Sequence, residues 1–219
     1  MADRPPVALE TRGEEGDGRR YSPSAARNRE PIRDVLSKLI STPARVLEIA
    51  SGTGEHGAFL AASIESIDWT YSDIDPDSLS SQATWQALDT TGRLHGPLTI
   101  DASSDEWLAA EAAGGWDAIF SANMVHIAPW RAATGLIRGA GRLLKPGGQL
   151  ILYGPFARSG VIAPSNAAFN ESLKSRNPDW GVRDLDRDLT PLAIAAGLAL
   201  HSVTEMPANN LTVSFRKSA

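Results

Sequence analysis

The chain has 219 residues, of which 42% are hydrophobic and 21% charged, and its formal net charge at pH 7 is -5. These values are typical of one soluble globular domain with a sizeable core, and they argue against a disordered chain. The mild excess of acid gives no general attraction to nucleic acid, so we expect none as a partner. No cysteine is present, which excludes disulfides, thiolate metal ligands and a cysteine nucleophile.

Neither a metal site nor a membrane segment is indicated. The histidines are scattered, at His56, His95, His126 and His201, without the spacing of metal ligands, so we expect no metal. No apolar run approaches the roughly 18 residues that a membrane-spanning helix needs. The first residues lack the apolar core of a signal peptide. We therefore expect a cytoplasmic protein with no membrane partner, and the sequence leaves its oligomeric state open.

A polar stretch and a helix begin the chain. Residues 1–20 are charged and rich in Gly and Pro, with little to bury, which predicts a flexible tail. From Ser24 to Ile40, apolar residues recur at spacings of three and four, which predicts a helix. Pro43 follows its end.

Apolar strand patterns then alternate with helical ones. Strands are expected at Arg45–Ala50, Ile67–Ser72, Pro97–Ile100, Trp116–Ser121 and Gln149–Tyr153. The helices between them are expected from a glycine-rich turn to Ala61, at Asp77–Leu88, around Ser104–Ala112 and at Trp130–Leu144. This alternation predicts an α/β fold with a Rossmann-like, doubly wound sheet that is mostly parallel.

After the fifth strand the pattern changes. Residues 154–187 are irregular, apart from an expected helix at Asn166–Lys174 capped by Ser165. Long loops in compact domains are often functional, so we interpret this segment as a cap over the substrate.

An antiparallel hairpin is expected to close the domain. A helix at Pro191–Ala196, with Thr190 as its N-cap, precedes strands at Leu198–Glu205 and Leu211–Phe215. Residues 21–219 are therefore expected to form a single domain with a seven-stranded sheet.

A glycine-rich turn follows the first strand of the sheet. The strand RVLEIA leads directly into Ser51-Gly52-Thr53-Gly54, and a helix begins just after it. Glycines let the backbone bend sharply and come close to a ligand, and the N-terminus of a helix favours a polar or anionic group. Glu48 is a carboxylate near the end of an apolar strand. A buried charge needs a partner, and a ligand ammonium would be one.

Two further acids follow the next strands. Asp73 ends the second strand and Asp101 follows the third. A carboxylate at the first of these positions suits the hydroxyls of a ribose, and one at the second can reach an adenine amino group. Each acid alone is more often a cap or turn former. In combination with the glycine turn, they predict a nucleoside site at the carboxyl ends of the strands.

Two nucleoside ligands compete for this site. The dinucleotide-binding fingerprint G-x-G-x-x-G is matched by Gly52, Gly54 and Gly57. Asp73 also follows these glycines at about the sequence spacing of the acid that binds the ribose in that fingerprint. S-adenosylmethionine (SAM) is favoured because Glu48 can hold an aminoacyl group where a dinucleotide has its pyrophosphate, and Asp101 adds an adenine contact. The early hairpin also leaves no room for a dehydrogenase's substrate domain. SAM is the expected cofactor, and an NAD(P)-dependent oxidoreductase is the weaker alternative.

Several motifs together resemble the class I SAM-dependent methyltransferases, namely VLEIASGTGEH, SDIDP, DASS, LLKPGGQLILYGPF and the C-terminal hairpin. Where that superfamily has the first glycine of its turn, this chain has Ala50. Further motifs are similar to the methyltransferase-like protein 26 family: SPSAARNREPI, SNAAFNESL, NPDWGVRDLD and EMPANNLTVSFRK. This similarity extends from Tyr21 to Lys217. It implies the methyltransferase fold but no particular substrate.

The resemblance implies SAM contacts at matching positions. Those around the methionine are Glu48, Ala50, Ser51, Gly52, Thr53 and Gly54. Those around the ribose and adenine are Asp73, Ile74, Asp101 and Ala102, and those at the sulfonium end are Asn123 and Met124. Arg27 and Asn28 of the first helix are expected to cover the carboxylate.

The expected reaction is methyl transfer from SAM to an O or N atom of a small-molecule acceptor. A sulfonium methyl is already activated, so alignment and exclusion of water are the main requirements. His126, just after the fourth strand, is the only histidine expected near the transferred methyl. It is our candidate base, and the alternative is that it only hydrogen-bonds the backbone.

The acceptor pocket is expected to combine aromatic and amide side chains, which suits a small, partly apolar molecule. The candidates are Tyr21, Trp130, Phe156, Asn166, Phe169, Trp180 and Asn209. The same cofactor residues would also serve a catalytically silent SAM-binding partner or regulatory protein, which is the alternative function.

Overall fold

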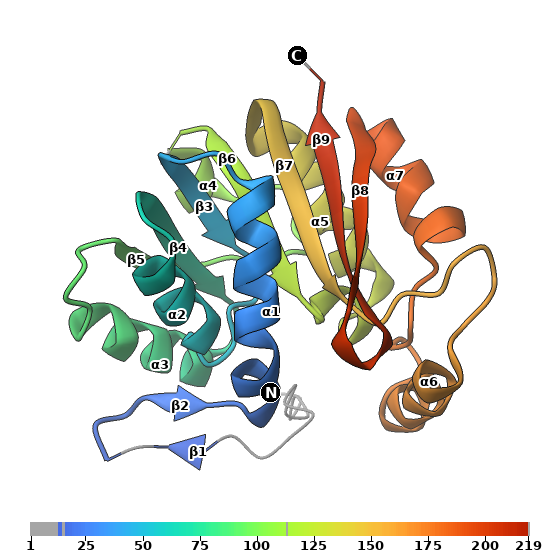
Figure 1. Ribbon diagram of the computed structural model, residues 1–219, viewed down its shortest axis with the longest axis horizontal. Helices are drawn as coiled ribbons and strands as arrows, with labels where there is room; N and C mark the ends of the chain where they lie inside the picture. Colours follow the sequence, from blue (N-terminus) through green and yellow to red (C-terminus); the bar gives the residue numbers. More distant parts are fainter. Residues whose placement is uncertain (1–12, 15, 113, 219) are drawn as a thin grey trace.

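A seven-stranded sheet forms the centre of the computed structural model, which describes residues 13, 14, 16–112 and 114–218 (Figure 1). In spatial order, the strands are β5 (Leu94–Thr99), β4 (Ile67–Asp73), β3 (Ala44–Glu48), β6 (Trp116–Ala122), β7 (Leu144–Gly154), β9 (Asn210–Lys217) and β8 (Leu198–Met206). The first five pair in parallel, and β9 runs antiparallel to both of its neighbours. The predicted α/β fold, with its mostly parallel sheet and antiparallel C-terminal hairpin, is confirmed.

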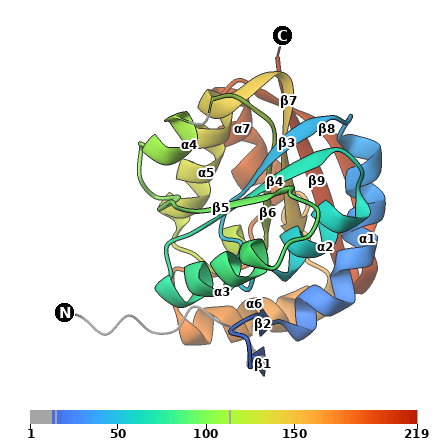
Figure 2. The same ribbon diagram turned by 90° about the vertical axis from the view of Figure 1, so that its left-hand side faces the viewer.

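Helices cover both faces of this sheet (Figures 1 and 2). One face carries α1 (Pro23–Leu39), α2 (Glu55–Ser63) and α3 (Pro76–Ala87), and the other carries α4 (Leu108–Ala112), α5 (Trp130–Leu143) and α7 (Thr190–Ala195). The buried apolar side chains accordingly form two clusters, one on each face of the sheet. Both faces of the parallel strands are therefore buried, as their continuous apolar runs require.

The strand order reverses between β3 and β6. From β3 the chain winds outward through β4 to β5, and then returns to the other side of β3 for β6 and β7. Open α/β sheets bind ligands at such a reversal, outside the carboxyl ends of the strands. In Figure 1 these ends lie at the lower side of the sheet, where α6 (Pro164–Arg176) also lies.

The N-terminal segment differs in part from the predicted tail. Gly13–Glu14 (β1) pairs antiparallel with Arg20–Tyr21 (β2), so this part of the segment has paired backbone. The hairpin lies close to α3, where the Arg20 N–H donates to Ser81 Oγ at 2.9 Å. The rest of the predicted tail, residues 1–12 and 15, lies outside the described residues.

Two predicted helix caps are wrong. Thr190 is the first residue of α7 rather than its N-cap, because the short helix η2 (Leu185–Leu189) runs directly into it. The helix expected from Asn166 begins earlier, at Pro164, with Ala163 as a cap that makes no side-chain hydrogen bond. Ser165 therefore lies inside the first turn. Proline at a helix start needs no N–H donor, which explains why α6 begins at Pro164.

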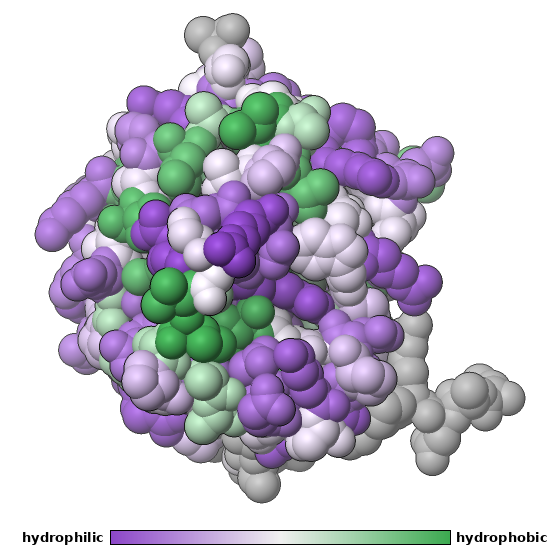
Figure 3. Space-filling model, turned by 90° about the vertical axis from the view of Figure 1, so that its right-hand side faces the viewer, coloured by the Kyte–Doolittle hydropathy of each residue, from purple (hydrophilic) through white to green (hydrophobic). Residues whose placement is uncertain are grey.

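The face that carries α6, α7 and β8 has a mixed surface. Apolar areas there are interrupted by polar and charged side chains (Figure 3). Within the described ranges, no helix has both the length and the apolar character of a membrane span.

Candidate functional site at the carboxyl ends of the strands

The turn between β3 and α2 passes through left-handed backbone conformations. Gly52 and Gly54 have φ angles of 57° and 85°, which glycine adopts without strain. A Cβ on Gly54 would also come within 2.9 Å of the Trp85 ring. Ala50 has a φ of 59°, so the residue that replaces the superfamily's glycine has a conformation that strains an L-residue.

Asp73, at the end of β4, holds this turn. Its Oδ2 accepts the Gly52 N–H at 2.9 Å, and its Oδ1 accepts the N–H groups of Ile74 at 2.8 Å and Asp75 at 3.0 Å. Burial raises the pKa of Asp73, although these hydrogen bonds oppose the shift. A carboxylate oxygen with one partner can still accept from a ligand hydroxyl.

Helix α3 supports the turn from the other side. Gln82 Nε2 donates to the Gly52 carbonyl at 2.9 Å, and Ser81 Oγ donates to the Thr53 carbonyl at 2.7 Å. The Ser51 hydroxyl donates to the Glu48 carbonyl at 3.3 Å and accepts the Ser72 N–H at 3.1 Å. The predicted turn residues Ser51, Gly52 and Thr53 are therefore tied to neighbouring elements through their backbone or hydroxyl groups.

Glu48 is a buried carboxyl group with no cationic partner in the part of the chain that the structure describes. Its side chain is 1% exposed, and Oε2 accepts the Trp69 Nε1–H at 2.9 Å. Burial raises the pKa of Glu48 to about 8, against the lowering effect of hydrogen bonds from Trp69 and Ser51. At neutral pH the group therefore retains its proton in this state. A positively charged group brought beside it would release that proton.

The adenine side of the predicted site contains one exposed apolar residue. Ile74 is 39% exposed at the end of β4, where its side chain is free to pack against a planar ring. Asp101 lies beyond β5, and its Oδ1 accepts the Ser103 N–H at 2.8 Å. Ala102 is buried, and its carbonyl lies against Gly135 of α5, where any Cβ would clash. The loop after β5 is thus held close to the sheet.

Helix α1 reaches over the glycine turn. The Ser22 N–H donates to Glu55 Oε2 at 3.0 Å, and Arg29 Nη1 lies 3.1 Å from Glu55 Oε1. Asn28 Oδ1 lies 2.6 Å from Nε2 of His56, the second residue of α2. Arg27 is exposed on the same helix and influences Tyr153 electrostatically. Of the two predicted lid residues, Asn28 therefore contacts His56 just beyond the turn, and Arg27 acts on Tyr153 of β7.

The loop after β6 contains the other predicted residues. Asn123 has a φ of 61°, and its N–H donates to the Tyr153 carbonyl at 2.8 Å. Met124 is 7% exposed. His126 is fully buried, and its Nδ1 accepts the Arg183 N–H at 3.2 Å. Burial lowers the pKa of His126 to about 3, with a further contribution from Arg183.

These contacts disfavour His126 as a base. Because a backbone N–H can only donate, Nδ1 uses its lone pair in that bond, and the ring proton resides on Nε2. His126 Nε2 is buried without a hydrogen-bond partner among the described residues. A base needs a free lone pair within reach of the acceptor, so the geometry agrees with the alternative of a histidine that hydrogen-bonds the backbone.

The predicted cap is attached to this loop. Arg183 donates through Nε to the Val125 carbonyl at 3.0 Å and through Nη2 to the Ala128 carbonyl at 3.1 Å, and its guanidinium lies 5.3 Å from the Trp130 ring centroid. The Gly181 N–H donates to the His126 carbonyl at 2.9 Å. This part of the cap is a fixed wall beside the loop after β6.

The structure brings together only some of the predicted acceptor residues. Phe156 packs edge-on to His126 at 4.7 Å. Asn166 Nδ2 donates to the Asn209 carbonyl at 2.9 Å, which ties α6 to the turn between β8 and β9. Phe169 is half-buried and Trp180 is 8% exposed. Tyr21 lies elsewhere, with its ring 5.3 Å from that of Trp85 on α3.

A family model described as a protein of unknown function, DUF938, matches residues 19–217. The chain belongs to the DUF938 family. A ubiquinone biosynthesis O-methyltransferase from Xanthomonas oryzae pv. oryzae is 34% identical over 154 residues, which are 67% of this chain and 57% of that protein.

Solved methyltransferases share the fold. An O-methyltransferase family protein from Burkholderia thailandensis matches with a TM-score of 0.72 and 19% identity, over 90% of this chain and 58% of that one. Human N-acetylserotonin methyltransferase in complex with SAM matches with a TM-score of 0.65 and 14% identity, over 87% and 55% of the two chains. The DUF938 chain thus spans little more than half the length of these relatives, and it has the class I methyltransferase fold.

Several residues of the candidate site were not predicted from the sequence. Gln82, Ser81 and Tyr153 contact the turn or the lid residues, yet no local motif marks them. His56 directly follows the glycine turn, and this position could have drawn attention to it. His56 joins His126 near the carboxyl ends of the strands, because Asn28 of α1 contacts it there.

Proposed function

We propose that this DUF938 protein transfers a methyl group from SAM to an oxygen or nitrogen atom of a small-molecule acceptor. The observation that carries the proposal is the glycine turn held by Asp73 beside Glu48, a buried carboxyl group without a cation. A molecule with hydroxyls for Asp73 and an ammonium near Glu48 would satisfy both groups. The shared methyltransferase fold and the O-methyltransferase relative support the same conclusion.

The residues present fit this methyl donor. Gly52 and Gly54 would let its aminoacyl part approach the turn, Asp73 would accept from the ribose, and Ile74 would pack against the adenine. Asp101 and Ala102 would border the adenine, and Arg27 would face the carboxylate. Asn123 and Met124 would border the sulfonium, which supplies an electrophilic methyl group.

The acceptor would bind between the loop after β6 and residues 154–187. Trp130, Phe156 and the segment fixed by Arg183 would form an apolar wall with few polar groups, which suits a small molecule. Similarity of motifs to the methyltransferase-like protein 26 family is part of this proposal, and it names no acceptor.

The alternative is a SAM-binding protein that has lost catalysis and acts as a partner or regulator. The raised pKa of Glu48 and the clamped turn support donor binding under either function. An NAD(P)-dependent oxidoreductase is less consistent with the site, because a buried carboxyl group beside the turn would face a pyrophosphate.

Binding of the donor is tested by calorimetry with SAM, with its demethylated product S-adenosylhomocysteine, and with NAD. We expect both adenosyl ligands to bind, with release of up to one proton per site at pH 7, because their ammonium would lower the pKa of Glu48. Buffers of different ionisation enthalpy measure that proton, and Glu48→Gln is the control that cannot release it. Tight binding of NAD without binding of either adenosyl ligand would contradict the proposal.

Catalysis is tested separately by incubating the protein with methyl-labelled SAM and a small-molecule metabolite extract. A labelled product supports a methyltransferase and identifies its acceptor. Binding of SAM without any labelled product would favour the silent alternative.

A further inference from the structure

Two histidines lie near the carboxyl ends of the strands, and they differ in which ring nitrogen is engaged. In His126, Nδ1 accepts a backbone N–H and its lone pair is used. In His56, Nε2 lies 2.6 Å from Asn28 Oδ1. Because an amide oxygen can only accept, His56 Nε2 must carry the ring proton. The lone pair of His56 therefore resides on Nδ1.

Tyr153 fixes the orientation of the Asn28 amide. A hydrogen bond from the Asn28 side chain lowers the pKa of the Tyr153 phenol, although burial raises it more. This direction agrees with an Asn28 amide that offers its N–H to Tyr153 and turns its oxygen toward His56 Nε2. One amide then sets both the tautomer of the imidazole and the partner of the phenol.

The position of His56 also fits a role in the reaction. Its ring packs edge-on to Phe120 of β6 at 6.5 Å, and it directly follows the glycine turn. Tyr153 pairs with Ala122 at the ends of β7 and β6. His56 thus follows the turn that would hold the donor and packs against β6, the strand that leads to the loop beside the expected acceptor. It is half-buried, whereas His126 is fully buried.

We propose that His56 Nδ1 is the base that takes the proton of an acidic acceptor hydroxyl, such as a phenol, with Asn28 and Tyr153 as positioning residues. This inference rests on the proposed function. The acceptor O–H bond breaks and its proton goes to His56 Nδ1. The O–CH3 bond forms as the C–S bond breaks, the electron pair of that bond goes to sulfur, and the imidazolium later loses its proton to water.

The surroundings of His56 keep its ring in the neutral form. Burial, together with Arg29 of α1, lowers the pKa of His56 to about 4, so the ring is neutral at physiological pH. Arg29 is itself paired with Glu55 of α2, and Arg27 of α1 lowers the pKa of Tyr153 on β7 electrostatically. A base with so low a pKa is weak, so only an acceptor that loses its proton readily suits it, and a phenol does so more readily than an alcohol or an amine.

The first test observes the tautomer without any substrate. In protein with nitrogen-15-labelled histidine, we expect NMR at pH 7 to find His56 protonated on Nε2 and bare on Nδ1. Asn28→Ala should give a mixture of both tautomers, because the acceptor that selects one has been removed. Protonation of Nδ1 in the unmodified protein would overturn the proposal.

The second test compares variants in the labelled-methyl assay. His56→Gln retains an amide that can bond Asn28 but has no basic nitrogen. We expect at least about a 100-fold loss of turnover, with binding of S-adenosylhomocysteine within about threefold of the unmodified protein. His95→Gln, at the opposite edge of the sheet, is the matched control and should keep full turnover. Turnover of His56→Gln within tenfold of the unmodified protein would overturn the proposal.

Different results would reject the proposed methyl transfer and the proposed role of His56. If the unmodified protein binds SAM but labels nothing in the extract, the proposed function fails, and the NMR result still decides the tautomer. If the labelled product carries its new methyl on nitrogen or carbon, methyl transfer holds and the phenol-directed role of His56 is rejected. The pH dependence of kcat/KM is measured as well. If kcat/KM of His56→Gln still falls at low pH as it does in the unmodified protein, another group is the base.

Discussion

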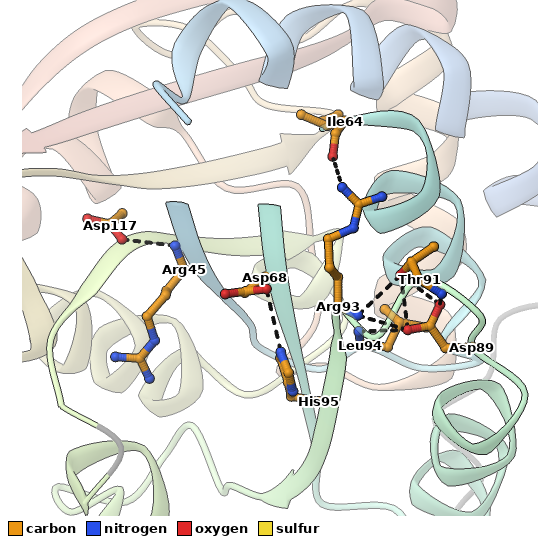
Figure 4. Close-up of polar contacts among 9 residues, drawn as sticks. All are labelled: Arg45, Ile64, Asp68, Asp89, Thr91, Arg93, Leu94, His95 and Asp117. Carbon is orange, nitrogen blue, oxygen red and sulfur yellow. Dashed lines mark hydrogen bonds and ion pairs between the residues drawn. The ribbon is translucent and has the colours of Figure 1, made fainter. Parts of the chain in front are cut away.

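The carboxylates at the amino ends and at the carboxyl ends of the parallel strands differ in their burial and in their partners. At the amino ends of the strands, carboxylates pair with cations or close loops (Figure 4). Asp68 lies 3.7 Å from His95 Nε2, and Asp117 accepts the Arg45 N–H at 2.8 Å and lies 2.8 Å from Lys145 Nζ. Asp89 accepts the N–H groups of neighbouring loop residues. These bonds lower its pKa, although partial burial acts in the opposite direction.

At the carboxyl ends, two buried carboxyl groups lack a cationic partner among the described residues. Glu48 and Asp73 are 1% and 8% exposed, and neither forms an ion pair within the described ranges. Burial raises the pKa of both. Unmatched buried charge is costly, so it is expected where a ligand supplies the missing partner. A buried acid without an ion pair at a strand end therefore indicates a ligand site more strongly than an exposed, paired one.

The largest effect is expected from the same substitution at the two ends of β4. Asp73→Asn replaces one carboxylate oxygen by an NH2 group, which cannot accept a hydrogen bond. Depending on the orientation of the amide, the Gly52 N–H or the N–H groups of Ile74 and Asp75 then face a donor. We expect a loss of about 1–3 kcal/mol in the free energy of unfolding, and SAM binding weakened at least about tenfold.

Asp68→Asn is the matched control for this prediction. Asp68 is exposed and its only polar partner among the described residues is His95, so we expect a change below about 0.5 kcal/mol. Urea unfolding and calorimetry measure both quantities. Equal effects of the two substitutions would remove the distinction between the edges.

A second effect concerns pH and is expected from Glu48→Gln. Between the usual pKa of 4.5 and the folded value of about 8, the unfolded chain loses the proton of Glu48 while the folded chain keeps it. Because the folded state then binds more protons, stability falls as pH rises through this window. Glutamine can still accept from Trp69 but cannot ionise, so the variant should lack this part of the pH dependence.

The measurement compares urea unfolding of both proteins at pH 5 and pH 8. We expect the free energy of unfolding of the variant to rise relative to that of the unmodified protein as pH increases, by at most about 1.4 kcal/mol per pH unit. The same variant should lose the proton release on SAM binding. A stability difference independent of pH would mean that Glu48 titrates normally in the folded chain.

Local patterns predicted the fold and the centre of the site. Apolar runs identified the strands, although β5 begins at Leu94, before the expected Pro97. The glycine turn and Asp73 were recognisable because strand, turn and helix are adjacent in the sequence. The structure adds that Asp73 holds the turn through Gly52, a contact across 21 residues.

The acceptor side could not be predicted in the same way. Its contacts join segments without a common period: Arg183 with His126 across 57 residues, and Asn166 with Asn209 across 43. The tautomers of His56 and His126 depend on such contacts, so the sequence could not distinguish the two as bases. The contact of Tyr21 with Trp85 was likewise not predictable, because Trp85 belongs to a helix far along the sequence.

The smallest effect is expected at the two ends of β3. Ala50, with its φ of 59°, has a conformation that costs an L-residue about 1–2 kcal/mol, whereas glycine loses about 0.5–1 kcal/mol of chain entropy on folding. Ala50→Gly should therefore stabilise the protein by about 0.5 kcal/mol. Ala44 is buried at the start of β3 without a positive φ, so Ala44→Gly should destabilise it by at least that amount. Urea unfolding at one pH compares them, and destabilisation by Ala50→Gly would mean that the packing of its methyl group outweighs the strain.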